Sequence, residues 1–202
     1  MILRKGSRGV EVESLQKALH LQMDGIFGPL TEEAVKEFQK ANGLKADGIV
    51  GDQTLKKIYG SSLSKSKRVI TEIIVHCSAT REGKDFTVAD ITRWHKQRGF
   101  TTIGYHYVIY RDGSRHNGRD INVSGAHCTG HNTHSIGVCY IGGCGADGLS
   151  PKDTRTAAQK TELLKLLREL RKLYPNAKIR GHRDFANRAC PSFDATKEYR
   201  YI

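Results

Sequence analysis

The stretch GHRDFANRACPSFD (181–194), near the C-terminus, constrains the fold more than any other part of the chain. It places a histidine, His182, eight residues before a cysteine, Cys190, and Pro191 follows directly. A helix would not bring the two side chains to one face, and proline disfavours a helix here, so we expect a loop that closes around one point. Imidazole and thiolate are side chains that zinc prefers, which makes this loop a candidate metal site.

A catalytic zinc site uses three protein ligands and leaves a fourth position for water. The best candidate for the third ligand is His76, which ends the apolar run IIV (73–75), because a buried strand supports a metal ligand rigidly. The chain has nine histidines and five cysteines, so a chance coincidence of the two residue types is the alternative. Spacing alone leaves both interpretations open.

Five ordered motifs resemble those of the zinc N-acetylmuramoyl-L-alanine amidases, and most closely the phage-type endolysins among them. The motifs are IIVHCSAT (73–80), IGYHYVIYRDG (103–113), HNTHSIGVCYIGG (131–143), GHRDF (181–185) and ACPSFD (189–194). The resemblance covers roughly residues 69–200. It implies the fold that these amidases share with peptidoglycan recognition proteins, and hydrolysis of the amide bond between N-acetylmuramic acid and L-alanine.

The resemblance also implies roles for single residues. Zinc would be held by His76, His182 and Cys190. Tyr105 stands where these amidases carry a tyrosine that orients water or supports the oxyanion, although without the resemblance an aromatic in the sheet core is the favoured interpretation. Arg188 stands where many phage members carry lysine. Because arginine is permanently charged, it can stabilise an oxyanion but cannot donate a proton, which puts a proton-donating role at this position in doubt.

The remaining histidines and cysteines receive weaker assignments. His127, in SGAHCTGH, matches a family histidine near the cleft, and we expect it to contact substrate. His95 and His106 are predicted to be structural. Cys77 should point away from the metal if His76 points toward it, because successive strand residues face opposite sides.

Residues 1–60 contain an internal repeat, in which DGIFGPLT (24–31) returns as DGIVGDQT (47–54) after 23 residues. Each copy predicts a glycine turn and a helix with a threonine N-cap, at Thr31 and at Thr54. With a further helix expected over 10–21, the segment forms a three-helix bundle close to the lower size limit for independent folding. It resembles the peptidoglycan-binding domain found beside many wall hydrolases, and a bundle used only for stability is the alternative.

The domain organisation follows from these patterns. We expect an all-α peptidoglycan-binding domain at 1–60, a polar, Ser-rich linker at 61–68 and a zinc amidase domain at 69–202. Strand and helix patterns alternate in the last segment, with strands expected over 69–76, 104–110 and 135–141. This alternation predicts an α/β fold with a central mixed sheet flanked by helices.

Charge bears on partners and compartment. The net charge is +12; residues 1–60 carry 9 Lys/Arg against 8 Asp/Glu, and residues 61–202 carry 24 against 13. A basic second domain favours an anionic partner such as the cell wall. The sequence shows no basic helix with interleaved aromatics, so we do not expect nucleic acid as the partner. MILRKGSRG lacks the apolar core of a signal peptide, and no segment reaches membrane-span length. We therefore expect a monomer with reduced thiols, made in the cytoplasm and released to the wall by other means, as in holin-dependent phage lysis.

Three other functions stay open at this stage. A peptidoglycan-binding protein without activity would have the same fold but typically lacks the full ligand set. A zinc peptidase cutting within the stem peptide would use the same metal chemistry on another bond. A basic nucleic-acid-binding protein would bind in a strongly salt-dependent way and would ignore chelators.

Overall fold

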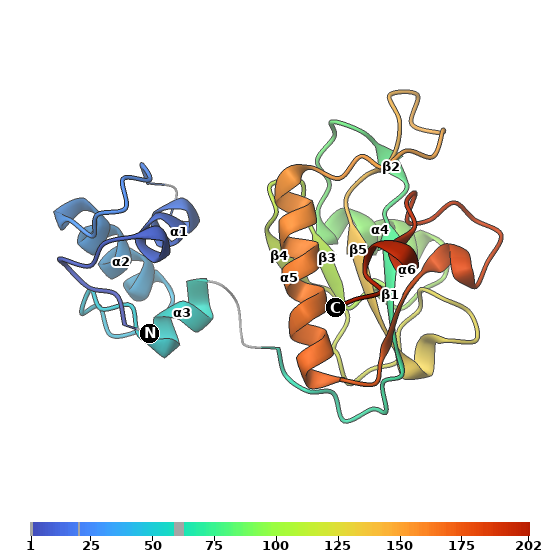
Figure 1. The fold of residues 1–202 in the computed structure, drawn as a ribbon, viewed down its shortest axis with the longest axis horizontal. Helices are drawn as coiled ribbons and strands as arrows, with labels where there is room; N and C mark the ends of the chain where they lie inside the picture. Colours follow the sequence, from blue (N-terminus) through green and yellow to red (C-terminus); the bar gives the residue numbers. More distant parts are fainter. Residues whose placement is uncertain (1, 20, 59–62) are drawn as a thin grey trace. The chain divides into compact units, whose positions relative to one another are not determined.

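The computed structural model describes residues 2–19, 21–58 and 63–202, and the chain divides into two compact units, Met1–Ser62 and Leu63–Ile202 (Figure 1). Residues 61 and 62 of the expected linker lie outside the described residues. From Leu63 on, the same segment belongs to the second unit, where the buried Ser66 receives a hydrogen bond from Arg68 N and donates one to Ile121 O. The domain boundaries expected at 60 and 69 stay predictions.

The first unit holds three helices, α1 (Val10–Ala18), α2 (Pro29–Ala41) and α3 (Asp52–Ile58). Antiparallel bridges join Leu3 to Val50 and Arg8 to Ile26 across the loops. The buried apolar residues form one cluster, made of Leu3, Val12, Leu15, Phe27, Val35 and Val50.

The predicted threonine N-caps are wrong. Helix α2 begins two residues before Thr31, with Gly28 as N-cap and Pro29 in the first turn, and α3 begins at Asp52. Proline suits the first turn of a helix because its missing N–H would be unpaired there. Helix α1 also ends at Ala18, earlier than the expected 21.

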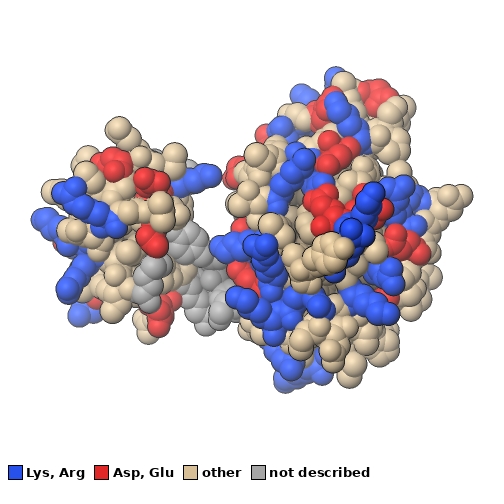
Figure 2. Space-filling model, viewed as in Figure 1, with Lys and Arg blue, Asp and Glu red and all other residues tan. Residues whose placement is uncertain are grey.

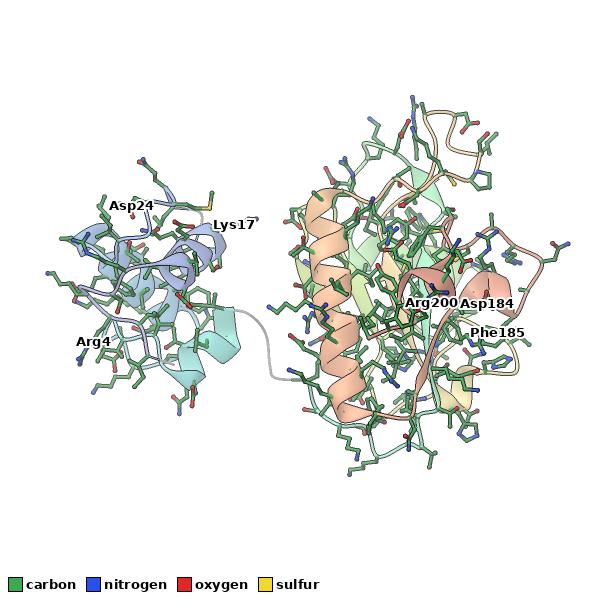
Figure 3. All side chains as sticks on the ribbon, in the orientation of Figure 1. Arg4, Lys17, Asp24, Asp184, Phe185 and Arg200 are labelled. Atoms are coloured by element: carbon green, nitrogen blue, oxygen red, sulfur yellow. The ribbon has the colours of Figure 1, made fainter. Side chains whose placement is uncertain are left out.

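The two threonines instead belong to a buried hydrogen-bond network centred on a glutamine, which the repeat forms twice and which we call the glutamine clasp. Gln16 Nε2 donates to Asp24 Oδ1, to Ile26 O and to Thr31 Oγ1, while its Oε1 accepts from Gly25 N. Asp24 is labelled in Figure 3. The second copy is made of Gln39, Asp47, Gly48, Ile49 and Thr54, in the same bonding pattern. Each buried glutamine therefore fastens the loop of one copy to the helix before it.

The second unit is built on a five-stranded sheet with the strand order β4-β3-β5-β1-β7. Its strands are β1 (Glu72–Cys77), β3 (Tyr107–Ile109), β4 (Arg115–Asn117), β5 (Ser135–Tyr140) and β7 (Lys178–Gly181). Only the β3–β4 pair is antiparallel among the described pairs of this sheet. A short parallel pair, β2 (Thr80–Arg81) and β6 (Gly143–Cys144), stands apart from it. This mixed sheet confirms the predicted α/β class.

Helices cover both faces of the sheet (Figure 1). Helix α5 (Ala157–Leu173) packs its buried leucines into the cluster that holds Ile73 and Val75 of β1. On the other face, α4 (Val88–Gln97) packs through Ile91 against Val108. Both helices begin with capping boxes, at Thr156 and at Thr87. The short α6 (Ala195–Glu198) and the 3-10 helices η1 (Asn132–His134) and η2 (His182–Asp184) complete the unit.

Two strands are shorter than predicted. The first begins at Glu72 instead of 69, where Val69 is largely exposed. Strand β3 begins at Tyr107 instead of 104, because Gly104 N donates a hydrogen bond to the side chain of His95, at Nδ1, and not to a neighbouring strand. No helix in the described residues combines the length and apolarity needed to cross a bilayer.

Candidate metal centre and its cleft

Two regions that lie far apart in the sequence, β1 and the stretch 181–190, bring His76, His182 and Cys190 together. His76 lies on β1, which runs between β5 and β7 and is therefore held by hydrogen bonds on both sides. His182 begins η2 directly after β7, where Gly181 pairs with Val75 of β1. Cys190 lies in the loop before α6, and its Sγ accepts a hydrogen bond of 3.3 Å from Cys77 N. The strand order alone thus places two of the three side chains at one end of the sheet.

Alternation along β1 separates His76 from its neighbour. Cys77 belongs to the buried cluster on the α5 face, whereas the fully buried His76 points to the opposite face, as the period of a strand requires. All five cysteines are free thiols.

The three side chains offer donor atoms that all lie within 4.8 Å of one another. Cys190 Sγ is 3.7 Å from His76 Nδ1, and the rings of His76 and His182 are 4.6 Å apart between centroids. A tetrahedral zinc with ordinary bond lengths separates a sulfur and a nitrogen ligand by about 3.6 Å. The donor set and its spacing therefore fit such an ion.

Burial sets the protonation of this cluster. It holds the pKa of His76 well below its usual range, and burial together with the Arg188 charge lowers the pKa of His182. Both imidazoles are thus neutral at pH 7, the form that binds metal. The neighbouring Cys77 side chain and burial raise the pKa of the Cys190 thiol, so a bound cation is needed to hold the thiolate.

The segment that carries His182 is fixed from two sides. The Asp184 carboxylate accepts hydrogen bonds from Gly181 N at 3.0 Å and from the Thr196 hydroxyl at the start of α6. The Phe185 ring packs at 4.0 Å on the ring of His131, whose Nδ1 is 2.8 Å from Glu72 Oε2. Figure 3 labels Asp184 and Phe185 at the end of η2.

The other predicted site residues lie close to this centre. The Tyr105 ring is half-buried, 5.0 Å from the His76 ring, and burial raises the pKa of its phenol well above the usual value. Arg188 is exposed at the edge of the cleft. The buried His127 places Nδ1 3.0 Å from His76 Nε2. His95 and His106 are buried and accept backbone hydrogen bonds, from Gly104 N and Gly137 N respectively.

Two of the metal candidates, His182 and Cys190, line a cavity of about 550 Å³. Helix α4 and the turn after it contribute Trp94, Arg98 and Phe100 to its wall. The described residues that line it include two arginines and no aspartate or glutamate. The cavity is thus suited to a substrate that carries carboxylates.

Sequence reasoning missed part of this wall. Trp94 is half-buried, packs against the core cluster of Ile91 and also lines the cleft, and Arg98 and Phe100 were assigned no role. Their only sequence signal is their place at the C-terminal end of α4, four and six residues beyond Trp94.

Comparison with known proteins agrees with this geometry. Residues 66–193 match the family model of N-acetylmuramoyl-L-alanine amidases, and residues 8–58 match that of a peptidoglycan binding domain. The endolysin of Klebsiella phage KP32 is 45% identical over 124 residues, which is 61% of this chain and 82% of that protein. The endolysin of Escherichia phage T7 is 42% identical over 130 residues, covering 64% and 85%.

Solved structures give the same result. The amidase LysC from Clostridium intestinale URNW superposes with a TM-score of 0.54 at 29% identity, covering 65% of this chain and 82% of that one. Drosophila PGRP-LB superposes with a TM-score of 0.56 at 25% identity, covering 72% and 91%. With a sheet of this order, a His–His–Cys cluster at its end and a family match over most of its length, the chain belongs to the N-acetylmuramoyl-L-alanine amidase family.

Proposed function

We propose that this chain is a phage-type endolysin that hydrolyses the amide bond between N-acetylmuramic acid and L-alanine, with a zinc ion held by His76, His182 and Cys190. The observation that carries the proposal is the cluster of these three donors, two of which line a cavity, in an amidase fold. Two neutral imidazoles and one thiolate would leave the bound ion with a net positive charge. Zinc in such a site acts as a Lewis acid toward the amide carbonyl and acidifies water.

Tyr105 and Arg188 are proposed to act on the reacting amide. The phenol of Tyr105 keeps its proton at neutral pH because burial raises its pKa, so it can donate a hydrogen bond to the amide oxygen or to water. Arg188 keeps its charge at every working pH and can stabilise the negative charge that develops on that oxygen. It cannot give up a proton, so protonation of the leaving amine falls to water, to Tyr105 or to a histidine.

The first domain, proposed to span residues 1–60, is assigned the binding of peptidoglycan. Its match to a peptidoglycan binding domain and its place beside an amidase support this assignment. A tether of this kind raises the local concentration of substrate around the second domain, proposed to span 69–202. Even a weak binding module then increases the rate on an insoluble wall.

Charge favours the same partner. The face of the second unit seen in Figure 2 carries many lysines and arginines, and residues 61–202 supply most of the net charge of +12. Peptidoglycan presents carboxylates on its stem peptides, so attraction over a Debye length brings enzyme and wall together. The proposed site of action is the bacterial cell wall, and the proposed state is a monomer.

The decisive experiment identifies the chemical ends that the protein releases from purified peptidoglycan, with a chelated sample beside it. New L-alanine amino termini that disappear on chelation and return with zinc are the expected result. New termini on another residue would move the cut into the stem peptide and keep the metal site. Firm binding to the wall with no new ends would contradict the enzyme assignment.

A further inference from the structure

Both ring nitrogens of His127 are engaged by buried protein atoms. Nδ1 is 3.0 Å from His76 Nε2, and Nε2 is 3.3 Å from the hydroxyl of Ser135, which is fully buried at the start of β5. A side chain on Gly125 or on Gly137 would come within 2.4 or 2.5 Å of the ring carbon Cδ2. The absence of side chains at the two glycines therefore makes room for the ring, which also lines the cleft.

The two nitrogens of His76 face different partners. Nδ1 lies 3.7 Å from Cys190 Sγ, on the side of the candidate metal site, and Nε2 faces His127. A neutral imidazole carries one N–H and one lone pair. A metal at Nδ1 needs the lone pair there, so the hydrogen of His76 must sit on Nε2 and point at His127.

This requirement passes along the chain of contacts. His127 Nδ1 must accept the hydrogen bond from His76, so the hydrogen of His127 sits on Nε2, within reach of Ser135 Oγ. The opposite order would put an N–H on Nδ1 of His76 and direct it at the metal position. One arrangement of hydrogens thus satisfies the three side chains and leaves the Nδ1 lone pair free.

We propose that His127 is a positioning residue that selects Nδ1 of His76 as the metal donor, with Ser135 completing the chain of hydrogen bonds. The inference rests on the proposed role of His76 as a ligand. It assigns His127 a role other than the predicted contact with substrate, because both ring nitrogens already have protein partners. No observation tests the predicted contact itself. Partners that orient a ligand in this way typically affect metal affinity by 10- to 100-fold.

The test compares two variants of matched size, His127→Asn and His127→Leu. Asparagine places an amide oxygen near the position of Nδ1 and can accept the hydrogen bond from His76, whereas leucine has the same branching and no acceptor. Zinc affinity of the full chain is measured by competition with a chelator of known affinity, and thermal unfolding is measured on the metal-free forms. We expect about 10- to 100-fold weaker zinc binding for His127→Leu, and near wild-type binding for His127→Asn.

A tautomer measurement needs no variant. In the zinc-loaded wild type, ¹H–¹⁵N NMR should show the His76 proton on Nε2, protected from exchange, and the metal on Nδ1. Ser135→Ala, which removes one buried oxygen, should weaken zinc binding less than His127→Leu does and should raise the exchange rate of the His127 ring proton.

Three outcomes would overturn the proposal: wild-type zinc affinity in a folded His127→Leu variant, metal on Nε2 of His76, or equal losses in the asparagine and leucine variants. A failure of the proposed ligand set gives a different result: if His76 is not a zinc ligand, the His76→Ala protein retains zinc. If His127→Leu does not fold, the NMR of the wild type and the affinity of Ser135→Ala still decide the question.

Discussion

The hydroxyl of Tyr140 donates a hydrogen bond of 2.7 Å to the carbonyl oxygen of Pro191, the residue that follows the proposed ligand Cys190. Tyr140 is fully buried on β5, so the central sheet holds the ligand loop directly. Tyr140→Phe leaves the buried Pro191 carbonyl without its partner. We expect the free energy of unfolding to fall by about 1–3 kcal/mol and zinc to dissociate faster, as measured by urea unfolding and chelator competition. Tyr201→Phe, at a largely exposed position, is the control that should change neither.

The ligand assignment predicts a contrast between two cysteines. Cys190→Ala removes the thiolate from the candidate site, and we expect loss of zinc retention and of amide hydrolysis. Cys144→Ala removes a buried free thiol of β6 that is not part of the donor cluster, so zinc content and activity should persist. Metal analysis of both purified proteins checks the contrast, and an active, zinc-free Cys190→Ala protein would refute the assignment.

Two exposed arginines of the cleft predict different kinetic effects. Arg188 lies close enough to His182 to lower the pKa of that imidazole, so its charge reaches the metal candidates. Arg188→Gln should lower kcat by about 10²-fold, as the loss of one group that stabilises the oxyanion does elsewhere. Arg188→Lys should keep most activity and add an alkaline limb to the pH profile, because lysine loses its charge near pH 10, about its ordinary pKa.

Arg98 lies at the C-terminal end of α4, with its guanidinium carbon 5.3 Å from the Phe100 ring centroid. It is proposed to attract a carboxylate of the stem peptide. Arg98→Gln should therefore raise KM and leave kcat close to the wild-type value, as measured on soluble muropeptides. A fall in kcat alone would place Arg98 in the reaction and not in substrate binding.

The glutamine clasp lies within the first unit, so we expect a substitution in it to lower the melting temperature of that unit alone. Gln39→Leu leaves Gly48 N without its buried acceptor, at a cost of about 1–3 kcal/mol. It also removes one hydrogen bond each from Ile49 O and the Thr54 hydroxyl, which stay bonded to each other at 3.4 Å. Calorimetry should show a lower melting temperature for the first unit and an unchanged transition for the second. Gln53→Leu, at an exposed position of α3, is the matched control. A common shift of both transitions would mean that the units unfold together.

Acid should destabilise the second unit through Arg155, which is nearly buried against the ring of Phe193. Its hydrogen bonds lower the pKa of Asp153 below 3.8, and they outweigh burial to keep the pKa of Glu198 below 4.5. Because the folded pKa values are depressed, this stabilisation is complete above about pH 4.5 and is lost as pH falls through the folded values.

Arg155→Met should cost about 1–3 kcal/mol at pH 7, less than a fully buried pair because both carboxylates are partly exposed. It should also flatten the acid dependence of unfolding. The exposed pair of Lys152 and Glu82 offers a control, since Lys152→Met should cost at most about 1 kcal/mol. Equal acid dependence in the wild type and in Arg155→Met would contradict this account.

Local signals predicted much of the fold. The capping boxes at Thr87 and Thr156 depend on residues three positions apart, so the sequence displays both partners of each. The N-cap predicted at Thr31 failed because the hydroxyl bonds to Gln16, fifteen residues earlier, and that contact exists only after the loop has folded.

In the site, too, local motifs could be predicted from the sequence, whereas contacts between distant residues could not. The motifs around His76, His182 and Cys190 resemble those of a known family, and the parallel strands bring these residues together. The bond between His76 and His127 joins residues 51 positions apart and depends on the glycines that admit the ring. No periodicity or spacing in the sequence records such a fit, so His127 was assigned from the family motif alone, and its predicted contact with substrate stays a prediction.

The alternation along β1 has a practical consequence for redesign. Ile73 and Val75 of this strand face α5 in a buried core and do not line the cleft, whereas Cys77 on the same side does line it and His76 faces the other way. A library restricted to the α5 face, for example at Ile73, Val75 and Leu167, can be screened for heat resistance alone. Its survivors should retain the bond preference of the parent enzyme, so shelf life and cleavage chemistry can be optimised in separate rounds.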